Sequence, residues 1–120
     1  MSTTYFNFEN LTVYQKSVVL SKDIYKATQK WPREFLFGLT DQLRRAVLSI
    51  SLNIAEGSSR TNKNFQHFLS ISRGSCFECI PLIQISLELN LLTKIEYSEL
   101  YNRFREIAQM LSGLRSSLRK

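Results

Sequence analysis

The chain has 120 residues, of which 43% are hydrophobic, and its sixteen Lys and Arg against ten Asp and Glu give a net charge of +6. This length fits a single domain, residues 1–120, and no stretch has the roughly 20 uninterrupted apolar residues that a membrane span needs. The N-terminal residues lack the basic and apolar segments of a secretory signal, so we expect a cytoplasmic protein. The basic excess favours anionic partners, mainly RNA, DNA or a membrane surface, although many basic proteins of this size bind no nucleic acid.

Four long helices are predicted, because only two prolines and four glycines interrupt the chain. The first helix should run from about Leu11 to Lys30, with Asn10 as its N-cap residue, and should end at the Trp31-Pro32 pair. Its apolar residues form two stripes, so it should contact more than one neighbour. One stripe comprises Leu11, Tyr14, Val18 and Tyr25, and the other comprises Val13, Leu20, Ile24 and Ala27.

The second helix should begin near residues 37–40 and end at Gly57, which suits a C-terminal cap in left-handed geometry. Its core face has helical spacing and comprises Leu39, Leu43, Ala46, Val47, Ile50 and Ile54. A second apolar stripe comprises Leu48, Leu52 and Ala55. A small monomer could hardly cover this stripe together with both stripes of the first helix, so we expect the chain to self-associate.

The third helix should run from about Lys63 to Asn90 with a kink at Pro81, because a proline inside a helix removes a backbone donor and crowds the preceding turn. The fourth should begin at a capping box formed by Thr93 and Glu96. Its apolar residues alternate at steps of three and four, as in a coiled-coil seam: Tyr97, Leu100, Phe104, Ile107, Leu111, Leu114 and Leu118. Short connections favour antiparallel neighbours, so the predicted fold class is all-α, an antiparallel up-down-up-down four-helix bundle.

The residue types that a catalytic or metal site requires are sparse. The only histidine is His67, which lacks the preceding glutamate of di-iron bundles and should lie at the surface. Cys76 and Cys79 have the spacing of a redox or zinc half-motif, but they fall in mid-helix without a second cysteine pair, which favours two core residues. The sequence contains no nucleophile-elbow motif and no phosphate-binding glycine loop. We therefore expect no enzymatic activity, no metal and no cofactor.

A polar stripe along the second helix has two interpretations. It is formed by Gln42, Arg45, Ser49, Asn53, Glu56 and Arg60, at steps of three and four. Such a stripe is often a solvated edge, but Asn53 lies between apolar neighbours and would need a hydrogen-bond partner if buried, which Ser75 or Glu78 could provide. We favour a structural polar network over direct ligand contact, and its predicted members are Gln42, Ser49, Asn53, Glu56, Ser75 and Glu78.

Two basic segments are candidates for phosphate contact. The loop from Ser58 to Lys63 places hydroxyls and two cations beside a helix N-terminus, where anions are favoured, although a capped polar turn is the preferred interpretation. The segment 111–120 has three cations and no acid, which would also stabilise the end of a helix. No recognition helix or stacking platform is evident, so we expect contacts to the backbone of nucleic acid. The candidate residues are Arg44, Arg45, Arg60, Lys63, Arg115 and Arg119.

The second helix also carries a specific resemblance to a known family. Residues 37–57, above all Asn53-Ile54-Ala55-Glu56-Gly57 with Arg60 after them, closely resemble the signature of four-helix bundle proteins encoded in intervening sequences of bacterial 23S ribosomal RNA genes. Matching pieces at residues 8–15, at Pro32 and Glu34, and at residues 68–78 extend the likeness over nearly the whole chain. The sequence departs from the family pattern at Cys79, where an aliphatic residue is usual, and at Pro81.

The resemblance implies an up-down four-helix bundle that assembles into a homopentamer. It also implies a basic surface for RNA or DNA. The accessory variability proteins of diversity-generating retroelements are similar proteins, and for them the resemblance implies a reverse-transcriptase partner. No catalytic residues carry over. We therefore expect a basic oligomeric module that binds nucleic acid and has no membrane partner. The alternative is a protein-interaction scaffold for a polymerase-like partner, and an enzyme is the least favoured class.

Overall fold

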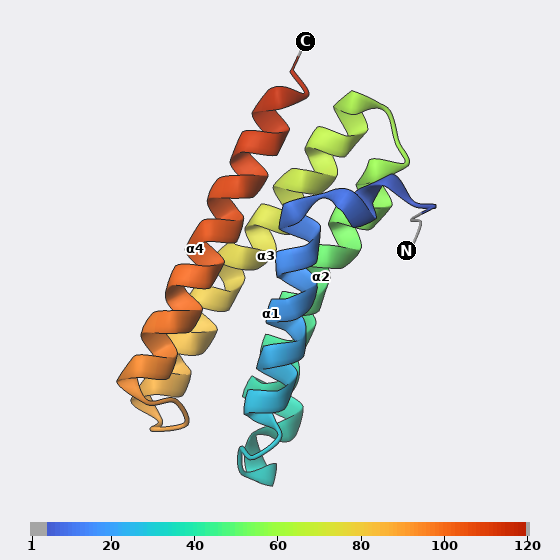
Figure 1. Cartoon of the computed structure of the whole chain (residues 1–120). Helices are drawn as coiled ribbons and strands as arrows, with labels where there is room; N and C mark the ends of the chain where they lie inside the picture. The colour runs from blue at the N-terminus through green and yellow to red at the C-terminus, as the bar shows by residue number, and fades with distance from the viewer. Residues whose placement is uncertain (1–4, 120) are drawn as a thin grey trace, which may run out of the picture.

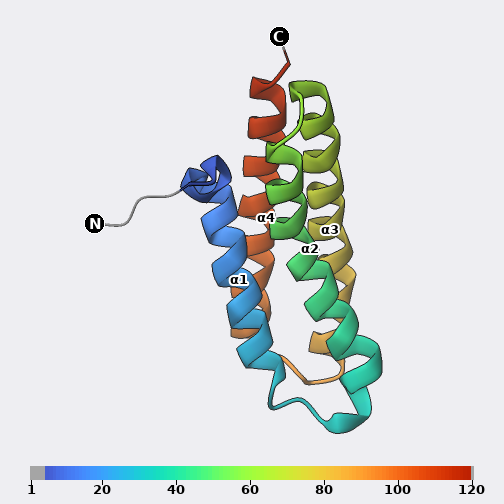
Figure 2. The same ribbon diagram turned by 90° about the vertical axis from the view of Figure 1, so that its right-hand side faces the viewer.

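The computed structural model describes residues 5–119, which form helices and turns but no strand. The four long helices are α1 (Thr12–Thr28), α2 (Asp41–Ser58), α3 (Asn62–Glu88) and α4 (Lys94–Ser117). A 3-10 turn, η1 (Asn7–Asn10), precedes α1, while η2 (Arg33–Phe35) and a π-helical turn, η3 (Leu36–Thr40), connect α1 to α2. Figures 1 and 2 show the four long helices running side by side. The prediction of an all-α chain with four helices is confirmed.

The helix α3 lies between α2 and α4 and has its most extensive contacts with these two helices, whereas α1 packs mainly on α2. Two side-chain contacts give the register of α3 against α4. Arg115 donates to the hydroxyl of Ser70 over 3.0 Å, and Gln84 donates to the hydroxyl of Tyr97 over 3.4 Å. Because these partners occur in opposite order along the two helices, the end of α4 lies beside the beginning of α3 (Figure 1).

A single apolar core receives side chains from all four helices. The predicted seam of α4 faces it: Leu100, Phe104, Ile107 and Leu111 are buried, and Tyr97, Leu114 and Leu118 pack against the core while partly buried. On α1, the stripe that contains Val13, Leu20 and Ile24 is buried. From the other predicted stripe, Val18 and Tyr25 are exposed, whereas Leu11 and Tyr14 pack against the core while partly buried.

Two helix boundaries differ from the sequence prediction. The first turn of α1 begins at Thr12, and Leu11 occupies the N-cap position without a side-chain hydrogen bond. Gly57 lies inside α2 and does not have the left-handed geometry expected of a cap. A Cβ atom added at Gly57 would lie 2.5 Å from the Cβ atom of Phe68 on α3. The glycine is therefore required by the close approach of two helices and not by a turn.

Backbone geometry ends α3, and side chains cap the start of α4. Asn90, with a φ angle of 61°, takes the left-handed position that commonly ends a helix. The predicted capping box is confirmed: the amide of Glu96 donates to Thr93 Oγ1 over 3.1 Å, and the amide of Thr93 donates to Glu96 Oε1 over 2.8 Å. The kink at Pro81 stays a prediction, but α3 continues through this residue.

Candidate nucleic-acid interface

Three members of the predicted polar network meet where α2 contacts α3. The hydroxyl oxygens of Ser49 and Ser75 lie 2.9 Å apart, and Asn53 Nδ2 donates to the carbonyl of Ser49 over 2.8 Å and to its hydroxyl over 2.9 Å. Gln42 and Glu78 line a small hollow beside this cluster and make no hydrogen bond to it among the described residues. These contacts connect two helices and engage the hydroxyls of Ser49 and Ser75 within the fold.

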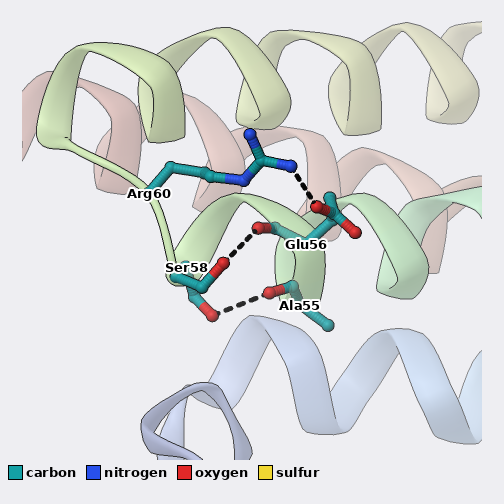
Figure 3. A network of polar contacts seen from close by, with 5 residues as sticks. Ala55, Glu56, Ser58 and Arg60 are labelled. Atoms are coloured by element: carbon teal, nitrogen blue, oxygen red, sulfur yellow. Dashed lines mark hydrogen bonds and ion pairs between the residues drawn. The ribbon is translucent and has the colours of Figure 1, made fainter.

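The loop between α2 and α3 is closed by its own side chains (Figure 3). The hydroxyl of Ser58 donates to the carbonyl of Ala55 over 2.8 Å, and the guanidinium of Arg60 pairs with the carboxylate of Glu56, the remaining member of the predicted network. Thr61 Oγ1 accepts a hydrogen bond of 3.3 Å from an amide in the first turn of α3. This geometry is that of a capped polar turn.

Arg44 and Arg45 lie near the beginning of α2, at the opposite end of that helix from Arg60. The guanidinium of Arg44 lies 4.1 Å from the ring centroid of Tyr25 and donates to Thr28 Oγ1 over 2.8 Å, so it connects α2 to α1. Arg45 pairs with Asp41 over 2.9 Å, one turn earlier on the same helix. The structure therefore separates these two candidates from the other four.

The remaining candidate cations lie where α3 begins and α4 ends. Lys63 belongs to the first turn of α3, Arg115 belongs to the last turn of α4, and Arg119 lies two residues after the end of α4. The hydrogen bond from Arg115 to Ser70 fixes α4 against α3 here, and both segments lie at the same end of the bundle (Figure 1). This arrangement brings three cations from distant parts of the sequence onto one face.

Two further arginines, Arg73 on α3 and Arg105 on α4, extend this face toward the middle of the bundle, and the sequence analysis missed both. For Arg73 the signal was present, because residues 61–77 contain no Asp or Glu, whereas Arg105 is followed directly by Glu106 and had no such signal. We call the set Lys63, Arg73, Arg105, Arg115 and Arg119 the α3–α4 cationic face. Within residues 5–119, none of these five side chains takes part in an ion pair.

A groove with a volume of about 550 Å³ lies between α3 and α4 beside these cations. Its walls are mainly apolar and include Phe77 and Tyr101, which are 56% and 40% exposed. The guanidinium of Arg73 lies 4.6 Å from the ring centroid of Phe77, and Arg105 also lines the groove. No carboxylate is among the lining residues. The sequence analysis did not foresee this grouping of two exposed aromatic rings with two arginines.

Some polar atoms on this face have no partner in the described part of the chain. The Nε atoms of Arg73 and Arg115 are buried and make no hydrogen bond there. In addition, Pro81 has no amide hydrogen, so the carbonyl of Phe77 lacks the donor that a helix ordinarily supplies four residues later. Hydrogen-bonding capacity is thus left unused around the groove.

The other residues singled out for chemistry have ordinary environments. Cys76 and Cys79 are free and buried, and burial raises the pKa of Cys76 to about 12 and that of Cys79 even further, so both thiols pack as neutral groups. His67 is exposed, as expected. Among residues 5–119, no three His, Cys, Asp or Glu side chains are grouped closely enough to hold a metal ion, and no helix has the length and hydropathy needed to cross a bilayer.

Comparisons with known proteins agree with this arrangement of helices. The sequence profile described as 23S rRNA-intervening sequence protein matches residues 9–113. A solved structure from Bacteroides thetaiotaomicron, described as a protein of unknown function from the S23 ribosomal protein family, has a TM-score of 0.80 and 22% identity over 87% of this chain and 95% of that chain. No curated protein matches. The chain belongs to the 23S rRNA-intervening sequence protein family.

Proposed function

We propose that this chain is a non-enzymatic, basic, oligomeric helical bundle that binds the phosphate backbone of nucleic acid through its α3–α4 cationic face. The observation that carries the proposal is the set of five cations without ion-pair partners among residues 5–119. Cations that are not neutralised by neighbouring carboxylates are free to attract phosphate groups. They extend from the end of the bundle to its middle, which suits contact with several consecutive phosphates.

The face also suits phosphate for a chemical reason. Four of its five cations are arginines, whose planar guanidinium groups present several donors that match phosphate oxygens. Three candidates from the sequence, Lys63, Arg115 and Arg119, remain in this proposal, whereas the ion pairs of Arg45 and Arg60 and the helix contact of Arg44 make them weaker candidates.

The salt dependence of RNA binding tests this proposal. Affinity for a labelled RNA should fall steeply as salt rises, because each phosphate contact releases counterions. The changes Arg105→Gln and Arg115→Gln should each reduce the slope of log affinity against log salt by about 1. Arg45→Gln, which removes an exposed arginine from α2, is the matched control and should leave the slope nearly unchanged. An affinity that does not depend on salt would contradict the proposal.

We further propose an antiparallel up-down-up-down bundle whose copies associate through the α1–α2 face, opposite the cationic face, and the family resemblance implies a homopentamer. Leu48 and Leu52 on α2 are 49% and 57% exposed, and Val18 and Tyr25 on α1 are exposed beside them. An apolar surface of this kind is commonly covered by another protein surface. A closed ring would cover it in every copy and bring several cationic faces together.

The mass of the protein in solution tests the assembly. Leu52→Glu should dissociate the oligomer, because it places a charge in an apolar contact. Ile95→Glu is the matched control, since Ile95 is exposed at the start of α4 and belongs to neither α1 nor α2. A wild-type protein that is monomeric at all concentrations would contradict assembly without contradicting nucleic-acid binding.

The same apolar surface supports a second candidate function, a scaffold for a polymerase-like protein such as a reverse transcriptase. Val18, Tyr25, Leu48 and Leu52 would then contact the partner instead of another copy. A protein that stays bound after nuclease treatment, and is lost with Leu52→Glu but not with Ile95→Glu, would favour the scaffold. Retention of a polymerase-like protein only through RNA would favour the first proposal.

A further inference from the structure

We propose that the groove between α3 and α4 receives one unstacked nucleobase, so that the protein binds single-stranded nucleic acid in preference to duplex. This proposal rests on the nucleic-acid binding proposed above and specifies its substrate class. The bases of a duplex are stacked on one another, whereas those of a single strand can leave the stack and lie against aromatic rings or guanidinium planes. The groove offers both kinds of surface.

The stacking surface is formed before any ligand arrives. Arg73 already lies over the ring of Phe77, at 4.6 Å from its centroid, and Tyr101 contributes a second exposed ring from α4. A guanidinium stacked on an aromatic ring loses little conformational freedom when a base joins it. The volume of about 550 Å³ falls in the range of about 300–1,000 Å³ that is usual for sites that hold small organic groups.

The groove also carries hydrogen-bonding groups that a base edge could use. The carbonyl of Phe77 lacks its helical donor because residue 81 is proline, and both residues line the groove. Gln109 lines it from α4 and has an amide that both donates and accepts. Pro81, which departs from the family pattern, thus removes one helical hydrogen bond beside an aromatic surface. An apolar ligand would leave the amide of Gln109 unused, whereas a base edge could bond to it.

The charges around the groove favour an anionic strand whose phosphates lie at the rim of the groove. Arg73 and Arg105 both belong to the lining and to the cationic face, and no carboxylate lines the groove. Arg115, which is held against Ser70 on α3, lies on the same face as Arg73 and Arg105 but closer to the end of the bundle. A strand whose phosphates contact Arg115 and Arg119 would therefore continue over the groove, where one of its bases can turn inward.

Binding of a short single-stranded RNA and of a duplex of the same sequence tests the inference. The double variant Phe77→Leu, Tyr101→Leu keeps apolar side chains but removes both rings. It should lower the affinity for the single strand about tenfold and that for the duplex less than about twofold, because base stacking on aromatic rings contributes only to the first. Phe37→Leu, at an exposed aromatic on η3 outside the groove, is the matched control and should change neither affinity.

The possible outcomes separate the groove from the cationic face. A single strand that carries 2-aminopurine should show a change in base fluorescence on binding to the wild type, and this change should be absent with the double variant. Equal affinity for both forms, unaffected by the double variant, would overturn the groove proposal and leave the proposed function standing. No binding of either form would overturn both. If the double variant instead lowers the mass of the protein in solution, the groove is a contact between copies and the proposal is wrong.

Discussion

The two sides of α3 differ in how completely their side chains are engaged in packing and hydrogen bonds within the fold. On the side that meets α2, Ser75 bonds to Ser49, and Gly57 admits Phe68 with no room for another carbon atom. On the side that meets α4, a groove of about 550 Å³ remains, and Arg73 has a buried nitrogen without a partner among the described residues. At the contact between α2 and α3, packing and hydrogen bonds within the fold use the available space and polar groups. At the contact between α3 and α4, space, charge and hydrogen-bonding capacity remain that the fold does not need.

This difference has a physical basis in the residues that α3 presents to each neighbour. Small side chains such as Ser72 and Ser75 allow α2 to approach closely, and their hydroxyls find partners, as when Ser72 donates to the carbonyl of Ile50 over 2.8 Å. Long side chains face α4, and Arg73 and Phe77 stack on each other along the helix surface instead of filling the space between helices. We therefore expect substitutions on the α2 side to change stability and those on the α4 side to change binding.

The largest expected effect comes from truncating a buried side chain of α3, compared with truncating an exposed side chain of the same helix. Leu69→Ala removes a fully buried side chain and should lower the free energy of unfolding by about 2–5 kcal/mol. Phe77→Ala, eight residues later, should lower it by about 1 kcal/mol or less, because most of its ring is already in contact with solvent. Urea unfolding measures both values. If the two changes cost the same, Phe77 belongs to the core and the two sides of α3 do not differ as stated.

Two glycine substitutions, one on α2 and one on α3, should change the stability of the protein in opposite directions. Gly57→Ala places its Cβ atom 2.5 Å from the Cβ atom of Phe68, and should destabilise the protein by about 1–3 kcal/mol through overpacking. Gly74→Ala, on the exposed surface of α3 with no atom within 4 Å, should stabilise it by about 0.5–1 kcal/mol through lower backbone entropy in the unfolded chain. Thermal unfolding of both variants distinguishes these signs. A neutral Gly57→Ala would mean that α2 and α3 separate easily.

A third pair of changes compares polar groups on the two sides. Ser75→Ala should destabilise the protein by about 1 kcal/mol, because it removes the partner of Ser49. Arg73→Met keeps the long stem over Phe77 and removes a buried donor without a partner, so it should change stability by less than about 0.5 kcal/mol in either direction. Ser98→Ala, at an exposed position on α4, controls for helix propensity. A large loss for Arg73→Met would show that this arginine supports the fold.

The sequence predicted best the features that depend on neighbouring residues. The capping box of Thr93 and Glu96 and the apolar seam of α4 follow from spacing within one helix, and the structure contains both. Asn53 was expected to need a partner because of the apolar residues around it, and it donates to Ser49 on its own helix instead of bonding to Ser75 or Glu78. In each case the chemistry of a short segment constrained the result.

The sequence predicted poorly the features that require two helices to meet. Gly57 was taken for a cap because glycine commonly ends helices, but its role depends on Phe68, which reaches it from another helix. Arg73 and Arg105 were missed because each lies alone in its own helix, and only the register of α3 against α4 brings them to one groove. The groove itself has no local signature, because it results from side chains that fail to fill the space between two helices.

The smallest expected effect concerns the end of α4 that lies away from the cations. A hydrogen bond from the amide of Thr93, with the charge of Lys30, lowers the pKa of Glu96 below its ordinary value of 4.5. Because the folded-state pKa is lowered, the contribution of this carboxylate is fully present above pH 4.5 and is lost as the pH falls through the folded-state pKa. Glu96→Gln should therefore cost about 0.5 kcal/mol at neutral pH and progressively less in acid. Glu99→Gln, on the exposed surface of the same helix, is the control. In the Glu96→Gln variant, amide hydrogen exchange should become faster in the first turn of α4 and nowhere else. If exchange in α2 also becomes faster, the contacts of α3 with α2 and with α4 open together.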